Sequence, residues 1–226
     1  MKPSILREQA LTPDGRLMTL SEHDGSYTIR VAGVELMTTR QHHSEEQLAR
    51  RACEPLEHAR SARVLIGGLG FGYTLRAALG SLRPDATVTV VEIMPEVVSW
   101  NRKPDYGLAG VLLDDPRVET ILGDVADVVG RRRGFFDAVI LDVDNGAAGL
   151  TTTENARLYT APGLARLHAS LRPDGLLAIW SAAGDPAFEE RLRRSGFAVI
   201  TERAPLHVGS GSSACLFIGR KEKAAG

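Results

Sequence analysis

The chain has few cysteines, no excess charge of either sign and no long apolar run. Its two cysteines, Cys53 and Cys215, are too few and too far apart for a disulfide framework or a metal-ligand spacing. We therefore expect buried thiols in a reducing compartment and no metal. The 27 basic and 28 acidic residues leave a net charge of -1. Charge thus gives no reason to expect nucleic acid or a membrane surface as a partner.

No segment approaches the roughly 20 apolar residues that a membrane-spanning helix needs. The first ten residues include Lys2, Arg7 and Glu8 and lack the apolar core of a signal peptide. These two absences predict a cytoplasmic protein. The 226 residues are 43% hydrophobic and 24% charged. This length and composition suit one α/β domain with a small additional module.

Residues 1–43 are predicted to form an N-terminal β-module. Short strand-like runs cover residues 17–20, 27–31 and 34–38, and Asp24-Gly25 is a turn signal between the first two. Ser44 then resembles a helix N-cap, and Leu48, Ala52 and Leu56 follow at helical spacing. We therefore expect a small antiparallel meander followed by a second domain over residues 44–226.

From residue 62 the pattern alternates between strands and helices. Apolar strands are predicted at residues 64–66, 87–91, 118–122, 138–141 and 176–180, with helices between them and a final antiparallel pair at 198–202 and 214–218. Continuous apolar strands that alternate with helices indicate a mostly parallel sheet covered on both faces. The predicted fold is α/β: a Rossmann-like domain over residues 63–219, preceded by the antiparallel β-module.

A glycine-rich turn follows the first of these strands. Gly68, Gly70 and Gly72 lack Cβ atoms, so the backbone can turn tightly and approach a ligand closely. Glu92 ends the next strand, 20 residues after Gly72, where a carboxylate can accept hydrogen bonds from both ribose hydroxyls. The pair predicts a site for a nucleoside of the S-adenosylmethionine type. The alternative to a nucleoside site is a purely structural one, in which the glycines form a tight turn and Glu92 is exposed to solvent.

Carboxylates also follow the third and fourth strands. Asp124 can accept from an adenine amino group or cap the helix that follows it. Asp142, Asp144 and Asn145 cluster after the fourth strand, where a substrate would react, although an Asx-type turn would use the same residues. We take Asp142 and Asp144 as the candidate catalytic residues.

The order of these motifs resembles the spermidine synthase family of aminopropyltransferases. The resemblance rests on the glycine turn, Glu92, Asp-Pro-Arg-Val at 115–118, Gly123-Asp124 and Phe-Asp-Ala-Val-Ile-Leu-Asp at 136–142. That family combines a small N-terminal β-module with the class I methyltransferase fold. The resemblance implies transfer of an aminopropyl-type alkyl group from S-adenosylmethionine, or its decarboxylated form, to a small amine. It also implies a homodimer.

On this resemblance Asp142 would hold the acceptor amine and Asp144 would be the general base. Asn145 stands where the family has its catalytic aspartate, and we include it with Tyr159 and His43 as candidate substrate contacts. Two other functions use the same nucleoside site. One is a methyltransferase acting on a small molecule, and the other is a non-catalytic nucleoside-binding protein. A dehydrogenase is disfavoured because the turn reads Gly-x-Gly-x-Gly rather than Gly-x-Gly-x-x-Gly.

Overall fold

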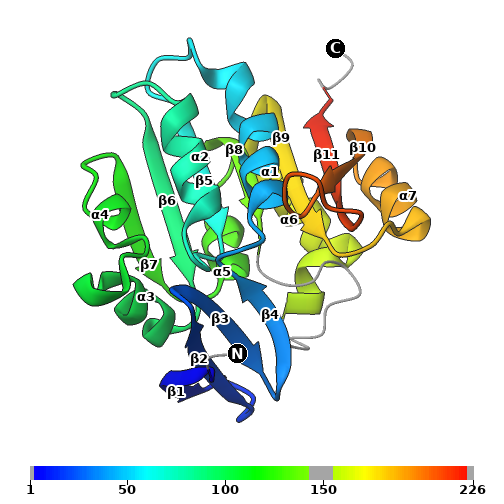
Figure 1. Ribbon diagram of the computed structural model, residues 1–226. Helices are drawn as coiled ribbons and strands as arrows, with labels where there is room; N and C mark the ends of the chain where they lie inside the picture. Colours follow the sequence, from blue (N-terminus) through cyan, green and yellow to red (C-terminus); the bar gives the residue numbers. More distant parts are fainter. Residues whose placement is uncertain (1–2, 143–154, 223–226) are drawn as a thin grey trace.

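The computed structural model describes residues 3–142 and 155–222, which form two sheets (Figure 1). The smaller sheet is antiparallel, in the order β1-β2-β3-β4. Its strands are β1 (Ile5–Leu11), β2 (Leu17–His23), β3 (Ser26–Val31) and β4 (Val34–Thr38). The three predicted strands are confirmed, and β1 is an addition. It is an edge strand whose side chains are mostly exposed, so it lacks the alternation by which a half-buried strand is recognised.

The larger sheet has seven strands in the order β10-β11-β9-β8-β5-β6-β7. The central strands are parallel, and β11 runs antiparallel to both of its neighbours. The bounds are β5 (Arg63–Gly67), β6 (Thr87–Glu92), β7 (Val118–Leu122), β8 (Phe136–Leu141), β9 (Leu171–Ser181), β10 (Phe197–Pro205) and β11 (Ser213–Lys221). The predicted fold class, a mostly parallel sheet after an antiparallel module, is confirmed.

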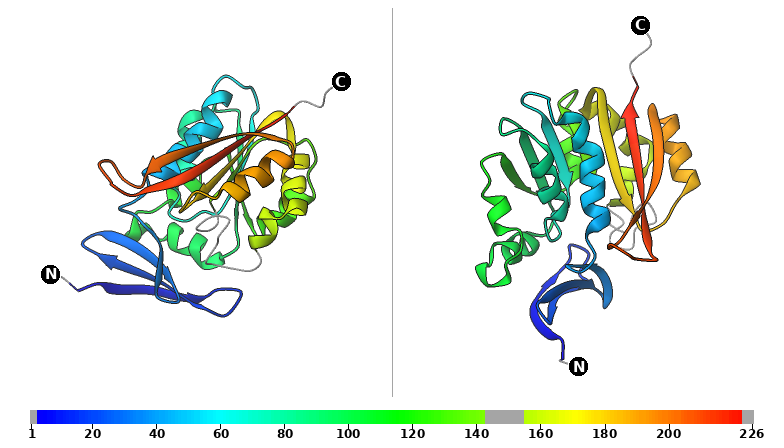
Figure 2. Two further views of the ribbon diagram at one scale, coloured as in Figure 1. Left: turned by 90° about the vertical axis from the view of Figure 1, so that its right-hand side faces the viewer. Right: turned by 45° about the horizontal axis from the view of Figure 1, so that its top comes forward.

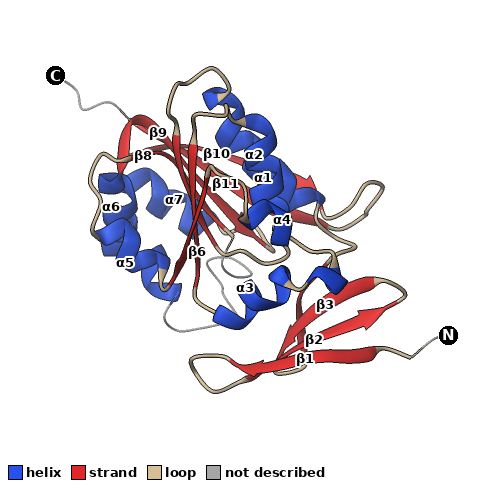
Figure 3. Cartoon of the chain, turned by 90° about the vertical axis from the view of Figure 1, so that its left-hand side faces the viewer, coloured by secondary structure: helices blue, strands red, loops and turns tan. Residues whose placement is uncertain are grey.

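Helices cover both faces of this sheet (Figure 3). One face carries α1 (His43–Cys53), α2 (Tyr73–Ser81), α3 (Pro95–Arg102) and α4 (Gly110–Leu113), and the other carries α5 (Val125–Gly130), α6 (Ala161–Ser170) and α7 (Pro186–Arg194). Three short 3-10 helices complete the list: η1 (Glu54–Leu56), η2 (Pro104–Tyr106) and η3 (Asn155–Tyr159). Strand residues alternate between two buried clusters: Val64 and Ile66 pack in one and Leu65 in the other. This double burial explains why the strands read as continuous apolar runs.

Several boundaries differ from the sequence prediction. Helix α1 begins at His43 with His42 at the N-cap position, so the prediction of Ser44 as the N-cap is wrong. Helix α1 ends at Cys53, and Leu56 lies in η1, because Pro55 has no N–H with which to continue the helix. Strand β9 begins at Leu171, which pairs with Phe136, whereas the next pair joins Leu176 to Ala138. The segment between them, which precedes the strand predicted at 176–180, is therefore an irregularity inside β9.

The smaller sheet packs below the carboxyl ends of the parallel strands (Figures 1 and 2). On one side, Glu8 of β1 pairs with Lys103 and accepts a hydrogen bond of 2.6 Å from the Tyr106 hydroxyl. The rings of Tyr27 and Tyr106 lie 5.3 Å apart. These contacts join the module to the segment that follows α3.

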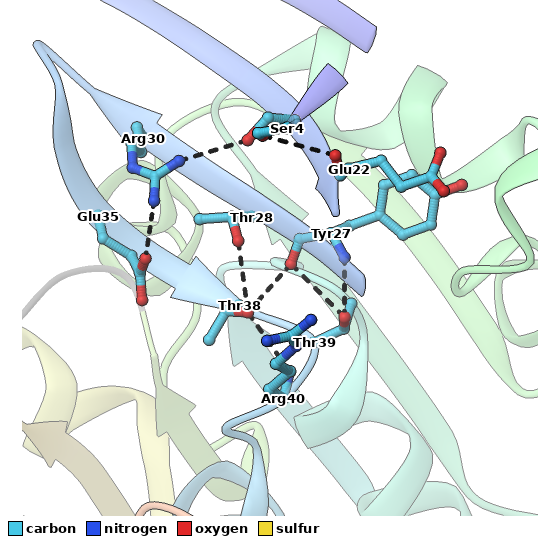
Figure 4. A network of polar contacts seen from close by, with 10 residues as sticks. Ser4, Glu22, Tyr27, Thr28, Arg30, Glu35, Thr38, Thr39 and Arg40 are labelled. Carbon is cyan, nitrogen blue, oxygen red and sulfur yellow. Dashed lines mark hydrogen bonds and ion pairs between the residues drawn. The ribbon is translucent and has the colours of Figure 1, made fainter. Parts of the chain in front are cut away.

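The end of β4 is fixed where the chain leaves the module. Figure 4 shows Thr38 and Thr39 around the backbone of Tyr27, which accepts from the Thr38 hydroxyl at 3.2 Å and donates to the Thr39 hydroxyl at 2.9 Å. The Tyr73 hydroxyl, at the start of α2, donates to the Thr39 carbonyl at 3.1 Å. The module is thus attached to the helix that the glycine turn opens.

Arg117 connects the end of α2 to the start of β7. Its Nη1 donates to the carbonyls of Leu79 and Leu82 at 2.9 and 3.1 Å, and its Nε and Nη2 bond both carboxylate oxygens of Asp115. We expect Arg117→Ala to lower the free energy of unfolding by about 2 kcal/mol or more, because it leaves two carbonyls and a carboxylate without this partner. Urea denaturation measures the change.

Arg102→Ala is the matched control for that experiment. Arg102 pairs with a single carboxylate, Asp114, and 46% of its side chain is exposed. An exposed pair contributes about 1 kcal/mol at most. Equal losses for the two variants would contradict a role for Arg117 beyond that of a surface ion pair.

Candidate functional site

The glycine turn lies where β5 ends and α2 begins. Gly68, Gly70 and Gly72 all have positive φ angles (89°, 51° and 78°), which L-residues adopt at a cost. A Cβ on Gly70 would lie 3.0 Å from the Met37 sulfur, and one on Gly72 would lie 2.3 Å from the Ala109 Cβ. The absence of side chains at 70 and 72 therefore lets β4 and the segment before α4 approach the turn. Gly68 and Gly70 also line a pocket.

Glu92, at the end of β6, is buried beneath this turn. Its two carboxylate oxygens accept backbone N–H bonds from Leu69 and Met94, each at 2.9 Å. Burial raises the pKa of Glu92, and these backbone donors oppose the rise. Only 7% of the residue is exposed, so the alternative of a solvated glutamate is wrong. Each oxygen retains a lone pair for a ligand hydroxyl.

Asn101 also fixes the turn, and the sequence analysis did not identify it. Its Nδ2 donates to the carbonyls of Gly70 and Val97, each at 2.8 Å, and its Oδ1 accepts from the Ala109 N–H at 3.1 Å. The residue is buried in α3. One asparagine in a helix forms no recognisable motif, so only the three-dimensional structure reveals the role.

The first pocket lies between the carboxyl ends of the strands and the smaller sheet. Its polar side comprises Gly68, Gly70, Glu92, Asp124 and Asp142. The opposite wall is mostly apolar and comes from the N-terminal module: Thr12, Pro13, Met18, Ile29, Val31, Leu36 and Met37. An apolar wall facing a few convergent polar groups is typical of a ligand pocket.

Asp124 lies at the edge of this pocket and caps α5. Its Oδ1 accepts from the Ala126 N–H at 2.7 Å, and its Oδ2 accepts from Arg157 at 2.6 Å. The helix-capping alternative is therefore confirmed. A contact between the Asp124 carboxylate and an adenine amino group remains a prediction, and the helix cap does not prevent it.

Asp142 follows the last residue of β8 and is shared by two pockets. Its backbone N–H donates to the Gly67 carbonyl at 3.0 Å, which holds it beside the glycine turn. Its Oδ2 accepts from the Thr74 hydroxyl at 2.8 Å. Burial raises the pKa of Asp142 to about 6, against the opposing effect of Thr74. A carboxyl group with this pKa can accept a proton near neutral pH.

The second pocket adjoins the first at Leu36, Met37 and Asp142. It is lined further by Glu35, Thr38, Gln41, Ser44, Glu45, Trp180, Ala182 and Leu206. The Trp180 indole N–H donates to the Ser44 hydroxyl at 3.0 Å, which joins β9 to α1. The described lining of this pocket therefore includes an aromatic side chain and three acidic residues, Glu35, Glu45 and Asp142, of which Glu35 is paired with Arg30 at 3.2 Å.

Of the remaining candidate residues, Asp144 and Asn145 lie outside the described residues. Tyr159 and His43 are described and line neither of the two pockets. Tyr159 is buried in η3 with its ring edge-on to Phe188 at 5.6 Å. His43 begins α1, where its Nε2 lies 2.7 Å from the Gln47 amide nitrogen.

Across residues 3–142 and 155–222, no group of three or more His, Cys, Asp and Glu side chains is arranged to hold a metal ion. Within the same residues, no helix has the length and apolar character needed to cross a membrane.

Curated relatives of the chain are polyamine aminopropyltransferases. It is 34% identical over 128 residues to polyamine aminopropyltransferase 2 of Pseudomonas aeruginosa, a match that covers 55% of this chain and 34% of the relative. It is 28% identical over 172 residues to the polyamine aminopropyltransferase of a Thermoanaerobacter species, covering 75% and 52%. The matched segments thus span about a third to a half of these relatives' own length. No protein-family model matches the chain.

Solved structures show the same fold. A spermidine synthase crystallised with a transition-state analogue superimposes with a TM-score of 0.75 at 19% identity, covering 96% of this chain and 72% of that one. At this identity the likeness concerns the fold alone. Together with the sequence matches, it confirms the expected resemblance: the chain is similar to the spermidine synthase-like family of polyamine aminopropyltransferases and has that family's methyltransferase-like fold.

Proposed function

We propose that the chain is a transferase that moves an aminopropyl-type group from a sulfonium nucleoside of the S-adenosylmethionine type to a small amine. The observation that carries the proposal is the meeting of two pockets at one partly buried carboxylate, Asp142. A two-substrate transfer needs two adjoining chambers with an acid–base group at their junction. The curated relatives are named for this reaction.

The first pocket has the features that a nucleoside requires. Glu92 offers lone pairs to ribose hydroxyls beside the glycine turn, and Asp124 lies where an adenine amino group would be accepted. The apolar wall from the N-terminal module, including Ile29 and Met37, would cover the flat faces of the base and ribose.

The charge of the pockets favours a donor without a carboxylate. The described side chains that line them include Glu35, Glu45, Glu92, Asp124 and Asp142, and none of the lining residues is a lysine or arginine. An α-carboxylate would lie among these acids, and the arginines at the pocket edges, Arg157 and Arg30, are already bound to Asp124 and Glu35. Such surroundings are unfavourable for a further anion in a partly buried site. A cationic aminopropyl group suits the same surroundings, so we infer the decarboxylated donor and not methyl transfer from S-adenosylmethionine.

The sulfonium supplies a carbon already activated toward substitution. The amine nitrogen forms the new N–C bond while the C–S bond breaks. The electron pair of the C–S bond stays on sulfur, so the sulfonium becomes a neutral thioether. The nitrogen loses one proton, and Asp142 is the described group placed to bind the amine and to accept that proton. Asp144, the general base expected from the resemblance, remains a prediction, as do the homodimer and the cytoplasmic location.

Calorimetry with the two donors tests this proposal. We expect decarboxylated S-adenosylmethionine to bind at least about tenfold more tightly than S-adenosylmethionine, because only the latter brings a carboxylate into the acidic site. Mass spectrometry with a small diamine should then show 5′-methylthioadenosine and an aminopropylated amine.

Formation of S-adenosylhomocysteine instead would support the methyltransferase. Tight binding of the carboxylated donor alone would overturn aminopropyl transfer.

A further inference from the structure

Asn101 is a buried polar side chain that lines neither of the two pockets. It lies in the last turn of α3, and its Nδ2 donates at 2.8 Å to the carbonyl of Gly70, which lines the first pocket. Among the described residues, no other group donates to that carbonyl. Asn101 therefore fixes the direction of the peptide group between Gly70 and Phe71 without itself reaching a ligand.

The same side chain connects the glycine turn to the segment before α4. Its Oδ1 accepts from the Ala109 N–H at 3.1 Å. A Cβ on Gly110 would lie 2.8 Å from the Asn101 carbonyl oxygen, and one on Gly72 would lie 2.3 Å from the Ala109 Cβ. The turn, the end of α3 and the start of α4 thus pack closely around one amide.

Helix formation does not explain the asparagine. Its bond to the Val97 carbonyl, at 2.8 Å, is local to α3, and a serine or threonine hydroxyl could donate to a carbonyl one turn back equally well. Two donated bonds and one accepted bond together require an NH2 group and an oxygen on the same side chain. The demand for an amide therefore comes from Gly70 and Ala109, which lie outside the helix.

The glycine turn needs such a partner. Gly70 has a φ of 51°, and a glycine can adopt either sign of φ at little cost. If nothing held its carbonyl, the peptide group that follows could rotate. A site that is competent for only a fraction of the time has an apparent affinity reduced by that fraction.

We propose that Asn101 is a positioning residue for the donor nucleoside, whose amide holds the Gly70 peptide group in the orientation that the first pocket presents to the ligand. This inference rests on the proposed function, in which that pocket binds the donor. Since Asn101 acts through the backbone of the turn and lies away from Asp142, its loss raises KM for the donor and leaves kcat at saturating donor nearly unchanged.

The test uses the full chain carrying Asn101→Asp, which keeps the shape of the side chain and the acceptor for Ala109 but removes the NH2 group. At pH 8, calorimetry should show 5′-methylthioadenosine binding about tenfold or more weakly than to the unchanged protein, because the Gly70 carbonyl loses its donor. KM for decarboxylated S-adenosylmethionine should rise by a similar factor, and kcat should change less than threefold.

Asn101→Ser is a second, milder variant. Its hydroxyl can bond the Val97 carbonyl within the helix but is too short to hold Gly70 as well, so the protein should fold and show a similar loss of thioether affinity. Affinity within about twofold of the original in either folded variant would overturn the inference.

Two other variants of α3 are the controls. Val98→Ala removes apolar contacts with the core and should lower the unfolding temperature, whereas Arg102→Ala breaks the ion pair with Asp114 at the end of α4. Both should keep the thioether affinity within about twofold. A loss in Val98→Ala equal to that in Asn101→Asp would show that general destabilisation suffices, and would overturn the positioning role.

Absence of thioether binding by the unchanged protein would overturn the inference as well. Failure of the proposed function has a different signature: the thioether would bind, and its affinity would depend on Asn101, yet no aminopropylated amine would form.

Discussion

Replacing Asp142 with asparagine should reduce kcat at least about 100-fold while donor affinity remains within about threefold. The substitution preserves the shape of the side chain and an oxygen to accept from Thr74, but it removes the group that we propose takes the proton from the amine. General bases typically contribute between about 10² and 10⁴ in rate. Steady-state kinetics and donor calorimetry on the same preparation measure the two quantities.

The pH profile makes this expectation specific. Because the pKa of Asp142 is about 6, kcat/KM of the unchanged protein should rise through a limb near pH 6 and level off above it. Asp142→Asn should lose that limb. Asp137→Asn is the control: Asp137 lies at the other end of the same strand, bonded to Arg172 and to the Arg63 N–H, and its loss should leave the limb intact. An unaltered profile in Asp142→Asn would remove Asp142 from the mechanism.

Asp142→Asn should lower the rate of the reaction but raise the free energy of unfolding above pH 6. The pKa of Asp142 is higher in the folded chain, about 6, than the ordinary aspartate value of 3.8, so the folded state binds this proton more tightly. The carboxyl group therefore destabilises the fold above pH 6 and ceases to do so as the pH falls toward 4. At pH 8, Asp142→Asn should thus be the more stable protein.

Replacing Glu92 with alanine should abolish measurable donor binding, with a loss of about 100-fold or more in affinity. The carboxylate is the acceptor for the Leu69 and Met94 N–H groups and the proposed acceptor for ribose hydroxyls. Hydrogen bonds to a charged group contribute about 1.5–3 kcal/mol each, so losing two reaches that factor. Calorimetry with 5′-methylthioadenosine measures the loss without any contribution from the sulfonium or the amine.

Glu119→Ala is the matched control, because this glutamate is exposed on the neighbouring strand β7 and lines neither pocket. Circular dichroism should show that Glu92→Ala keeps its secondary structure. Retention of the thioether by a folded Glu92→Ala protein at the original affinity would show that the nucleoside binds elsewhere.

The sequence was sufficient for features that are local in the chain. Strands such as residues 64–66 and 87–91 were predictable because burial on both faces selects continuous apolar runs. Gly68, Gly70 and Glu92 were predictable because their spacing along the chain reflects a strand–turn–helix unit. By contrast, β1 was missed because an exposed edge strand needs no apolar alternation.

The parts of the site that depend on distant contacts were not predictable. Glu45 lines the second pocket only because α1 packs beside β8 and β9, and Asn101 reaches the glycine turn only because α3 lies against it. The apolar wall of the first pocket comes from residues such as Met37, whose hydrophobicity alone is equally consistent with core packing. Tyr159 is the opposite case. It was predicted as a substrate contact, but its side chain is buried in the core against Phe188.

The position of Asp142 at the junction of the two chambers makes the two ligands mutual effectors. Near and below pH 6, where Asp142 is partly protonated, a positive charge that enters either chamber would favour the ionised carboxylate. The ionised carboxylate would then attract a cation in the other chamber more strongly, against the direct repulsion between the two cations. Thermodynamic linkage requires the coupling to be reciprocal, so whichever substrate arrives first increases the affinity for the second by the same factor. On the proposed function, a single partly buried acid would thereby couple the binding of the two substrates near pH 6 without any movement of the backbone.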